Sequence, residues 1–406
     1  FAAGKPLKSA EFTSGGPREM RRSAVGGAAW TMGYGGTSGG GSAAGEPLES
    51  GTYQRAGAVP GEGEGDGYMT LSLIAAAVSF VLTLLIGRFL IPELRKLKAG
   101  QEIREDGPTW HKSKAGTPTM GGIMFIIGIV VSAVITIPIY YAMSGGGTLG
   151  IFGETVLMQV KVFGGLFMAV GFGAIGFFDD YIKVVKKRNL GLTAWQKLIL
   201  QFLVAGAYLL SIFLAGEDTR TFIPLVGSVD LSYGYWILAA IVIVGIVNAV
   251  NFTDGIDGLN TSVTFFVALF FMLIGTVINT VGISLLSVCV AGGCMGFLVW
   301  NFNPAKVFMG DTGSLFLGGI VCALAFGMDM PILLFPLGII YIAEILSVVL
   351  QVLYFKATKG KRLFKMSPIH HHFEMCGWSE IKICGVFSLV TVIFGILSLV
   401  WVIFGV

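Results

Sequence analysis

Asn248-Ala-Val-Asn-Phe-Thr-Asp-Gly-Ile-Asp-Gly-Leu-Asn260 is a polar stretch between two apolar segments, residues 235–247 and a run that starts at Val263. It contains two carboxylates, Asp254 and Asp257, and three asparagines. Polar groups at a membrane boundary are costly unless they have partners or a ligand. The stretch therefore predicts a binding site between two membrane spans.

The composition indicates an integral membrane protein. Of 406 residues, 54% are hydrophobic and 13% charged, with a mean hydropathy of +0.80, whereas a soluble protein has roughly 25% charged residues. The apolar residues form continuous blocks of about 20, which suit membrane-spanning helices and lack the alternation of barrel strands. The sequence thus predicts an all-α polytopic membrane fold with about ten transmembrane helices. The expected spans lie near 71–91, 120–141, 160–178, 198–215, 235–250, 262–280, 283–300, 314–328, 331–354 and 383–405, the ninth opening at Pro331.

The segment before the first span differs from the rest of the chain. Residues 1–68 are rich in Gly, Ala and Ser and lack apolar periodicity, so they are predicted to be a disordered extension of a membrane domain at 69–406. A second hypothesis places the natural start at Met69. The five cysteines show no metal-type spacing and are expected to be apolar filler in helices.

The placement of charge predicts the orientation. Basic residues gather in the loops after spans one, three and nine, and the intervening loops contain almost none. By the positive-inside rule, the odd-numbered loops are cytoplasmic and both termini lie outside. Five polar clusters then share the cytoplasmic face, which predicts that the site lies there. These clusters are residues 111–122, 176–183, 248–260, 301–314 and 368–374.

The acidic residues of these clusters suit a divalent cation. Asp179-Asp180 could be a solvated helix end, but adjacent carboxylates also hold cations or keep one acid available as a base. Asp311 lies between glycines before an apolar span. Hard oxygen donors of this kind suit Mg²⁺, which binds through one or two carboxylates, waters and substrate phosphates.

The polar stretch itself offers a face to a ligand. Asn248, Asn251, Asp254 and Asp257 recur every three residues, so on a helix they share a broad face. A polar helix cap explains one or two of these side chains but not the whole series.

Basic side chains beside the acids are expected to face phosphate. For each of Lys114, Lys183, Lys187 and Lys306, contact with lipid headgroups is the alternative. These features together indicate a reaction that joins a membrane lipid to a soluble phosphorylated substrate, and no nucleic-acid partner is expected. Phosphoryl transfer depends on charge neutralisation and positioning.

Two further polar features remain open. The rings of His370, His371 and His372 point in different directions on a helix, so phosphate binding or loop ordering fits better than joint metal ligation. Glu344, inside the ninth span, is either a helix–helix contact or a member of the site.

From about residue 71 to the C-terminus, the chain resembles the bacterial phospho-N-acetylmuramoyl-pentapeptide transferases of the polyprenyl-phosphate N-acetylhexosamine-1-phosphate transferase superfamily. The first and last of five motifs favour this branch over relatives that use other UDP-sugars. The motifs are Gly-Thr-Pro-Thr-Met-Gly-Gly (116–122), Gly-Phe-Phe-Asp-Asp-Tyr-Ile-Lys (176–183), Asn-Ala-Val-Asn-Phe-Thr-Asp-Gly-Ile-Asp-Gly-Leu (248–259), Val-Phe-Met-Gly-Asp-Thr-Gly-Ser (307–314) and Pro-Ile-His-His-His-Phe-Glu (368–374).

The resemblance implies ten helices, a cytoplasmic active site, Mg²⁺ dependence, a homodimer and a place in the bacterial inner membrane. It also implies the substrates of that family, UDP-N-acetylmuramoyl-pentapeptide and undecaprenyl phosphate, and its products, lipid I and UMP. Asp311 is expected to bind Mg²⁺ with Asp179 and Asp180 nearby. One of those two, preferably Asp179, would deprotonate or orient the lipid phosphate.

The remaining roles also follow from the resemblance. Lys114, Asp257 and Phe308 resemble a uracil pocket. The expected catalytic residues are Asp179, Asp180, Asp311, His370 and His371. The expected substrate-binding residues are Lys114, Thr119, Lys183, Asn248, Asn251, Asp254, Asp257, Asn301, Phe308, Gly310 and His372. Direct attack by the lipid phosphate is preferred over an aspartyl-phosphate, because a carboxylate neutralised by Mg²⁺ is a poor nucleophile.

Three alternative functions differ in what they require. A secondary transporter predicts ionisable groups near mid-bilayer and an internal repeat, whereas the acidic clusters lie at helix ends. A non-catalytic membrane scaffold would not need five polar clusters on one face. A sister transferase that uses UDP-N-acetylglucosamine differs only in the histidine motif and the loop after span one.

Overall fold

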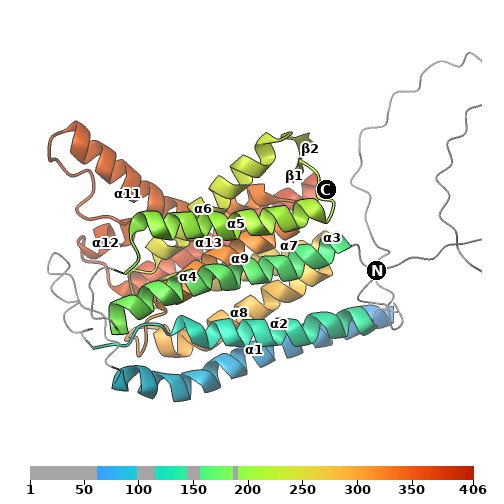
Figure 1. The fold of residues 1–406 in the computed structure, drawn as a ribbon, viewed down its shortest axis with the longest axis horizontal. Helices are drawn as coiled ribbons and strands as arrows, with labels where there is room; N and C mark the ends of the chain where they lie inside the picture. The colour runs from blue at the N-terminus through green and yellow to red at the C-terminus, as the bar shows by residue number, and fades with distance from the viewer. Residues whose placement is uncertain (1–61, 98–113, 115, 144–155, 186–190) are drawn as a thin grey trace, which may run out of the picture. The chain divides into compact units, whose positions relative to one another are not determined.

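A computed structural model describes residues 62–97, 114, 116–143, 156–185 and 191–406. Within these residues, ten helices are long and apolar enough to cross a membrane, and most of them run lengthwise across the view in Figure 1. They are α1 (Glu62–Lys96), α2 (Gly122–Met143), the continuous run of α3 (Val156–Gln159), a π-helical turn η3 (Val160–Gly164) and α4 (Gly165–Val185), then α5 (Ala194–Leu214), α6 (Gly234–Thr253), α7 (Leu259–Val277), α8 (Val281–Asn301), α9 (Gly310–Gly327), α11 (Ile339–Ala357) and α13 (Glu380–Gly405). The predicted ten-helix membrane fold is confirmed.

The ninth predicted span is corrected at its start. Pro331 opens a 3₁₀ turn, η4 (Pro331–Leu333), which is followed by the short α10 (Leu334–Leu337). The long helix α11 starts only at Ile339, after a break at Gly338. Pro336, inside α10, has no N–H to donate to the carbonyl of Ile332, so the helical hydrogen-bond pattern is also incomplete between η4 and α10.

A small hairpin was not predicted. Strands β1 (Arg220–Ile223) and β2 (Gly227–Asp230) pair antiparallel, with Arg220 opposite Asp230. The backbone N–H of Phe222 donates to the carbonyl of Asp329 over 2.9 Å, which attaches the hairpin to the end of α9. Four-residue strands carry too little apolar alternation for a sequence pattern to reveal them.

The N-terminal prediction is partly corrected. Residues 1–61 lie outside the described residues, as does the greater part of the proposed extension. Residues 62–68, predicted to be disordered, form the first turns of α1. A helix already nucleated by an apolar span extends at low cost.

The cysteine prediction holds for four of the five residues. The thiols of Cys289, Cys294, Cys322 and Cys384 are free and buried, whereas Cys376 is free and exposed after the short helix α12 (Ile369–Glu374). Cys376 therefore does not fill an apolar helix interior.

Helices α4 and α9 pack closely at their site-bearing ends. At Gly176 of α4, an added Cβ atom would lie 2.0 Å from the carbonyl oxygen of Asp311 in α9. Small residues let membrane helices approach at backbone distance. The glycine therefore sets how closely the ends of these two helices lie.

Gly176→Ala is expected to destabilise the protein by about 1–3 kcal/mol, because the new methyl group forces the backbones of α4 and α9 apart. The measurement is thermal unfolding in detergent. Gly206→Ala on α5 is the matched control, since nothing lies within 4 Å of its added Cβ. That control is expected to be neutral or stabilising, and equal losses in both variants would contradict the close-packing explanation.

One end of the bundle collects the polar helix termini. The last residues of α4, α6 and α8 and the first residues of α9 and α13 lie at the left in Figure 1, where α12 also lies. The hairpin lies at the other end. The polar clusters therefore converge in space, as the sequence predicts.

Candidate active site

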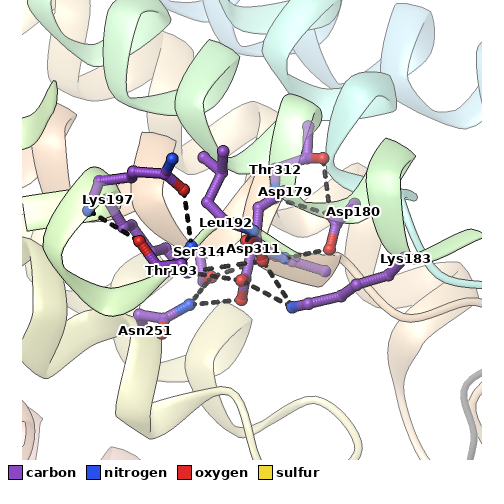
Figure 2. A network of polar contacts seen from close by, with 12 residues as sticks. Asp179, Asp180, Lys183, Leu192, Thr193, Lys197, Asn251, Asp311, Thr312 and Ser314 are labelled. Carbon is purple, nitrogen blue, oxygen red and sulfur yellow. Dashed lines mark hydrogen bonds and ion pairs between the residues drawn. The ribbon is translucent and has the colours of Figure 1, made fainter. Parts of the chain in front are cut away.

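Three carboxylates meet where the end of α4 lies against the start of α9. Asp179 and Asp180 are buried near the C-terminal end of α4, and Asp311 is the second residue of α9. One oxygen atom from each lies within 4.8 Å of the others. Figure 2 shows these side chains converging. The predicted acidic cluster is thus assembled from residues 131 positions apart in the chain.

Asp180 organises the N-terminus of α9. Its carboxylate accepts hydrogen bonds from the backbone N–H of Thr312 at 2.9 Å, the Thr312 hydroxyl at 2.7 Å and the N–H of Asp311 at 3.3 Å. The first N–H groups of a helix lack partners within it. Asp180 therefore caps α9 and fixes the backbone that carries Asp311.

Gly310 makes room for the Asp180 cap at the start of α9. Its φ is +70°, and an added Cβ would lie 2.5 Å from the Asp180 carboxylate and 2.6 Å from the Thr119 hydroxyl. An L side chain rarely adopts that backbone conformation. Gly310 thus lets Asp180 and Thr119 close on the turn before α9.

Two lysines face the other carboxylates. The ammonium group of Lys183 lies 2.5 Å from Asp179 and 3.2 Å from Asp311. The ammonium group of Lys197, from the first turn of α5, lies 2.6 Å from Asp311 and 3.7 Å from Asp179 (Figure 2). Lys197 was not predicted, and its only sequence signal is a lone cation at the start of an apolar helix.

Asn251 orients Asp311. Its amide donates to one Asp311 oxygen at 2.9 Å and to the Ser314 hydroxyl at 2.7 Å. Asn248, one turn earlier on α6, exchanges hydrogen bonds with Gln201 of α5. Asn248 and Asn251, predicted to share one face, therefore contact different neighbours. Asn251 belongs to the acidic cluster, whereas Asn248 links α6 to α5.

The donor set fits Mg²⁺. It consists of carboxylate oxygens, which are hard ligands, and both Asp180 oxygens are used by the α9 cap. Asp311, with 20% of its side chain exposed, and Asp179 are therefore the better candidate ligands. A cation held through few carboxylates keeps room for waters and substrate phosphates.

A second charged cluster surrounds Asp257. Lys114 lies 2.7 Å from Asp257 and 2.6 Å from Glu380 in the first turn of α13. The other Asp257 oxygen accepts from the Ala305 N–H at 2.9 Å and from the Asn303 amide at 3.2 Å. Glu380 also accepts the N–H of Asp257 at 3.0 Å. Glu380 therefore joins the polar stretch to α13. Its place in the site was not predicted.

Titration of the loop residues follows from burial and charge. Burial lowers the pKa of Lys114, but hydrogen bonds and charges from Glu380 and Asp257 outweigh that effect and raise it overall. Burial raises the pKa of Asp254 well above its usual range, and the nearby charges of Asp311 and other acids add to the effect. Lys114 therefore remains a cation, whereas the pKa of Asp254 shifts toward the neutral acid.

The three histidines of α12 have separate partners. The Nδ1 atoms of His370 and His371 lie 3.0 Å from Glu344 and 2.6 Å from Glu374, respectively. The Nδ1 of His372 accepts the Lys365 N–H at 3.1 Å. The three rings have different partners, but those of His370 and His371 lie against each other, with their centroids 4.1 Å apart, so the prediction that the rings point apart is not confirmed for this pair. Glu344 belongs to this group.

The other expected binding residues are held by protein contacts. Asn301 is buried, accepts from the Thr261 hydroxyl at 3.0 Å and donates to the Val307 carbonyl at 3.0 Å. The backbone N–H of Phe308 donates to the Pro118 carbonyl at 2.8 Å, and the Phe308 carbonyl accepts the N–H of Gly121 at 2.8 Å, so the Phe308 backbone pairs with the segment around Thr119. The ammonium group of Lys306 lies over the Trp300 ring, 5.3 Å from its centroid. Lys187 lies outside the described residues.

Comparisons with known proteins identify the relatives. Residues 162–329 match the glycosyl transferase family 4 model, and residues 114–126 match the first signature of phospho-N-acetylmuramoyl-pentapeptide-transferase. A protein of that name from Halalkalibacterium halodurans is 45% identical over 79% of this chain and 94% of its own length. The chain belongs to the phospho-N-acetylmuramoyl-pentapeptide-transferase family.

Other members of the transferase family agree with this assignment. The proteins of that name from Desulforamulus reducens and Clostridium perfringens are 43% and 44% identical, over 80% and 79% of this chain and 94% of each relative. The acidic cluster and the polar stretch both fall within the matched glycosyl transferase region, whereas the histidines of α12 and Glu380 of α13 lie outside it.

Proposed function

We propose that this chain transfers phospho-N-acetylmuramoyl-pentapeptide from its UDP conjugate to undecaprenyl phosphate, producing lipid I and UMP. The observation that carries the proposal is the convergence of three carboxylates within 4.8 Å in a member of this transferase family. Carboxylates at a membrane-helix end would serve a cation and phosphates there. The basic loops support placing this end in the cytoplasm of a bacterial cell, at the inner membrane.

Asp311 and Asp179 are the proposed Mg²⁺ ligands. The bound ion would neutralise charge on the diphosphate as the bridging bond breaks. Lys183 and Lys197 lie against the same carboxylates, so their ammonium groups can turn to phosphate oxygens. Asp180 contributes by holding the start of α9 in place.

The proposed transfer is a direct displacement. An oxygen of the lipid phosphate forms a bond to the phosphorus attached to the sugar, and the bond from that phosphorus to the UMP oxygen breaks. Asp179, buried in the cluster, would orient the attacking oxygen of the lipid phosphate, or accept its proton through an oxygen that is not bound to the ion. UMP leaves with the electron pair of the broken bond.

The nucleotide is proposed to lie over the second cluster. Asp257 and Lys114 supply charged hydrogen-bonding groups, and Phe308 supplies a partly exposed ring for stacking on uracil. Asp254, in the same polar stretch, is proposed to lie beside the diphosphate. His370 and His371 lie on α12, and the His370 ring contacts the polar stretch at Gly255.

Glu380→Gln is expected to raise the KM for the UDP substrate roughly tenfold with little change in kcat, the equivalent of one charge-assisted hydrogen bond. Its carboxylate fixes both Lys114 and the N–H of Asp257. The matched control is Lys382→Gln, two residues along α13, where the ammonium group lies over Trp378. Equal KM values for the two variants would remove Glu380 from the nucleotide site.

The test of the function uses detergent-solubilised protein with Mg²⁺, undecaprenyl phosphate and one UDP-sugar at a time. UMP release is expected from UDP-N-acetylmuramoyl-pentapeptide and not from UDP-N-acetylglucosamine. Release from the second sugar alone would transfer the assignment to the sister enzymes. If neither UDP-sugar released UMP, the proposed transferase activity would be contradicted. A homodimer is also proposed, and light scattering of the solubilised protein tests it.

A further inference from the structure

Glu344 is an acid inside a membrane helix with a single side-chain partner among the described residues. Its Oε2 lies 3.0 Å from the Nδ1 of His370, and both side chains are fully buried. An ionisable group at this depth is costly and marks either a structural contact or a functional one. The surroundings of the pair distinguish these two roles.

The pair is incompletely satisfied. Within the part of the chain that the structure describes, neither the Oε1 of Glu344 nor the Nε2 of His370 has a hydrogen-bond partner. Buried polar atoms almost always have partners, so each exception needs an explanation. A buried polar pair that served stability alone would gain from full satisfaction of its atoms.

The free ring nitrogen lies at the polar stretch. A Cβ atom added to Gly255 would lie 2.0 Å from the Nε2 of His370, so the ring edge contacts the backbone beside Asp254. Only a glycine permits this approach. The unpartnered nitrogen is therefore aimed at the segment proposed to bind the diphosphate.

Helix α11 holds the α12 segment through one face. Seven residues after Glu344, the Gln351 side chain accepts the N–H groups of Leu363 and Phe364 at 3.0 and 2.9 Å. Residues seven apart lie on one helix face. Glu344 thus belongs to a row of side chains on α11 that fixes the chain leading to the histidines.

We propose that Glu344 is a positioning residue that acts through His370. As a carboxylate it only accepts hydrogen bonds, so it holds the proton on Nδ1 and leaves the Nε2 lone pair facing the polar stretch. This choice of tautomer is how a partner acid commonly orients a histidine. The inference rests on the proposed transfer reaction and adds a residue from the membrane interior to it.

The first test needs no activity. In protein labelled with ¹⁵N-histidine, the His370 resonances, assigned by comparison with His370→Ala, are expected to show a protonated Nδ1 and an unprotonated Nε2. Glu344→Gln is expected to produce a mixture of tautomers, because an amide can donate as well as accept. A protonated Nε2 in the native chain would overturn the proposal.

The second test uses the transfer assay. Glu344→Gln is expected to lower kcat roughly 10- to 100-fold with less than about a threefold change in KM, and Glu344→Asp, which keeps the carboxylate, to recover part of the loss. The matched control is Glu217→Gln, a buried acid 2.6 Å from Lys161 at the hairpin end of the bundle. The control should keep the native kcat and His370 spectrum.

A double-mutant cycle separates positioning from a merely structural contact. Adding Glu344→Gln to His370→Ala should cost no further kcat if Glu344 acts through the ring. Additive losses, or equal kcat losses in the Glu344 and Glu217 variants, would contradict the proposal. If the native chain were inactive, the proposed function would be contradicted, and the ¹⁵N measurement would still test the role of Glu344.

Discussion

Asp311→Asn is expected to lower lipid I synthesis about a hundred- to a thousand-fold, even at saturating Mg²⁺. The substitution keeps the side-chain shape and removes the negative charge that Lys183, Lys197 and the proposed cation share. Removing one group that stabilises developing charge commonly costs two to three orders of magnitude in kcat. The measurement is UMP release across a Mg²⁺ titration.

The matched control is Asp218→Asn, an aspartate 62% exposed beside the hairpin. Its turnover should equal that of the native protein. The Asp311 variant is expected to keep the native unfolding temperature to within a few degrees, because Asp180 still caps α9. Near-native turnover of Asp311→Asn would remove this residue from the metal site.

Asp180→Ala is expected to abolish activity for a different reason. The substitution leaves the Thr312 N–H and hydroxyl without their acceptor at the start of α9. Loss of a helix cap together with a buried unsatisfied donor costs about 2–4 kcal/mol. Both thermal unfolding and UMP release are therefore expected to fall.

The two aspartate variants distinguish capping from chemistry. Asp311→Asn should lose activity at nearly constant stability, whereas Asp180→Ala should lose both. If Asp180→Ala retained native stability and lost only turnover, Asp180 would be a reacting group or a metal ligand instead of the cap that its contacts indicate.

The helices were predictable because each is a long apolar block. The first acids of the site were predictable for a related reason, since Asp179, Asp180 and Asp311 interrupt apolar sequence at helix ends where an unpartnered charge is costly. The break before α11 was not predicted, because Pro331 also suits the first turn of a continuous helix.

Contacts between side chains on different helices could not be predicted from the sequence. Lys197 reaches Asp311 over 114 positions, and Glu380 reaches Lys114 over 266 positions. Each is a single charge at the start of an apolar helix, a place where charge is ordinary. Helix packing, which periodicity alone does not determine, decides which of these residues meet.

The same limit explains the division of the polar stretch. The spacing of Asn248 and Asn251 predicts one shared face, yet α5 lies close enough for Gln201 to pair with Asn248. Asn251 instead contacts Asp311. A three-residue step turns a helix by less than one full turn, so neighbouring helices can receive successive members of the series.

The central claim is that the carboxylates at the junction of α4 and α9 hold the cation that supports transfer. Mn²⁺ binding, followed by electron paramagnetic resonance in detergent and competed with Mg²⁺, tests this claim most directly. The native chain is expected to bind about one ion that Mg²⁺ displaces, and Asp311→Asn is expected to lose that binding while Asp218→Asn keeps it. Equal binding by the native and Asp311→Asn proteins, or no binding by the native protein, would contradict the claim.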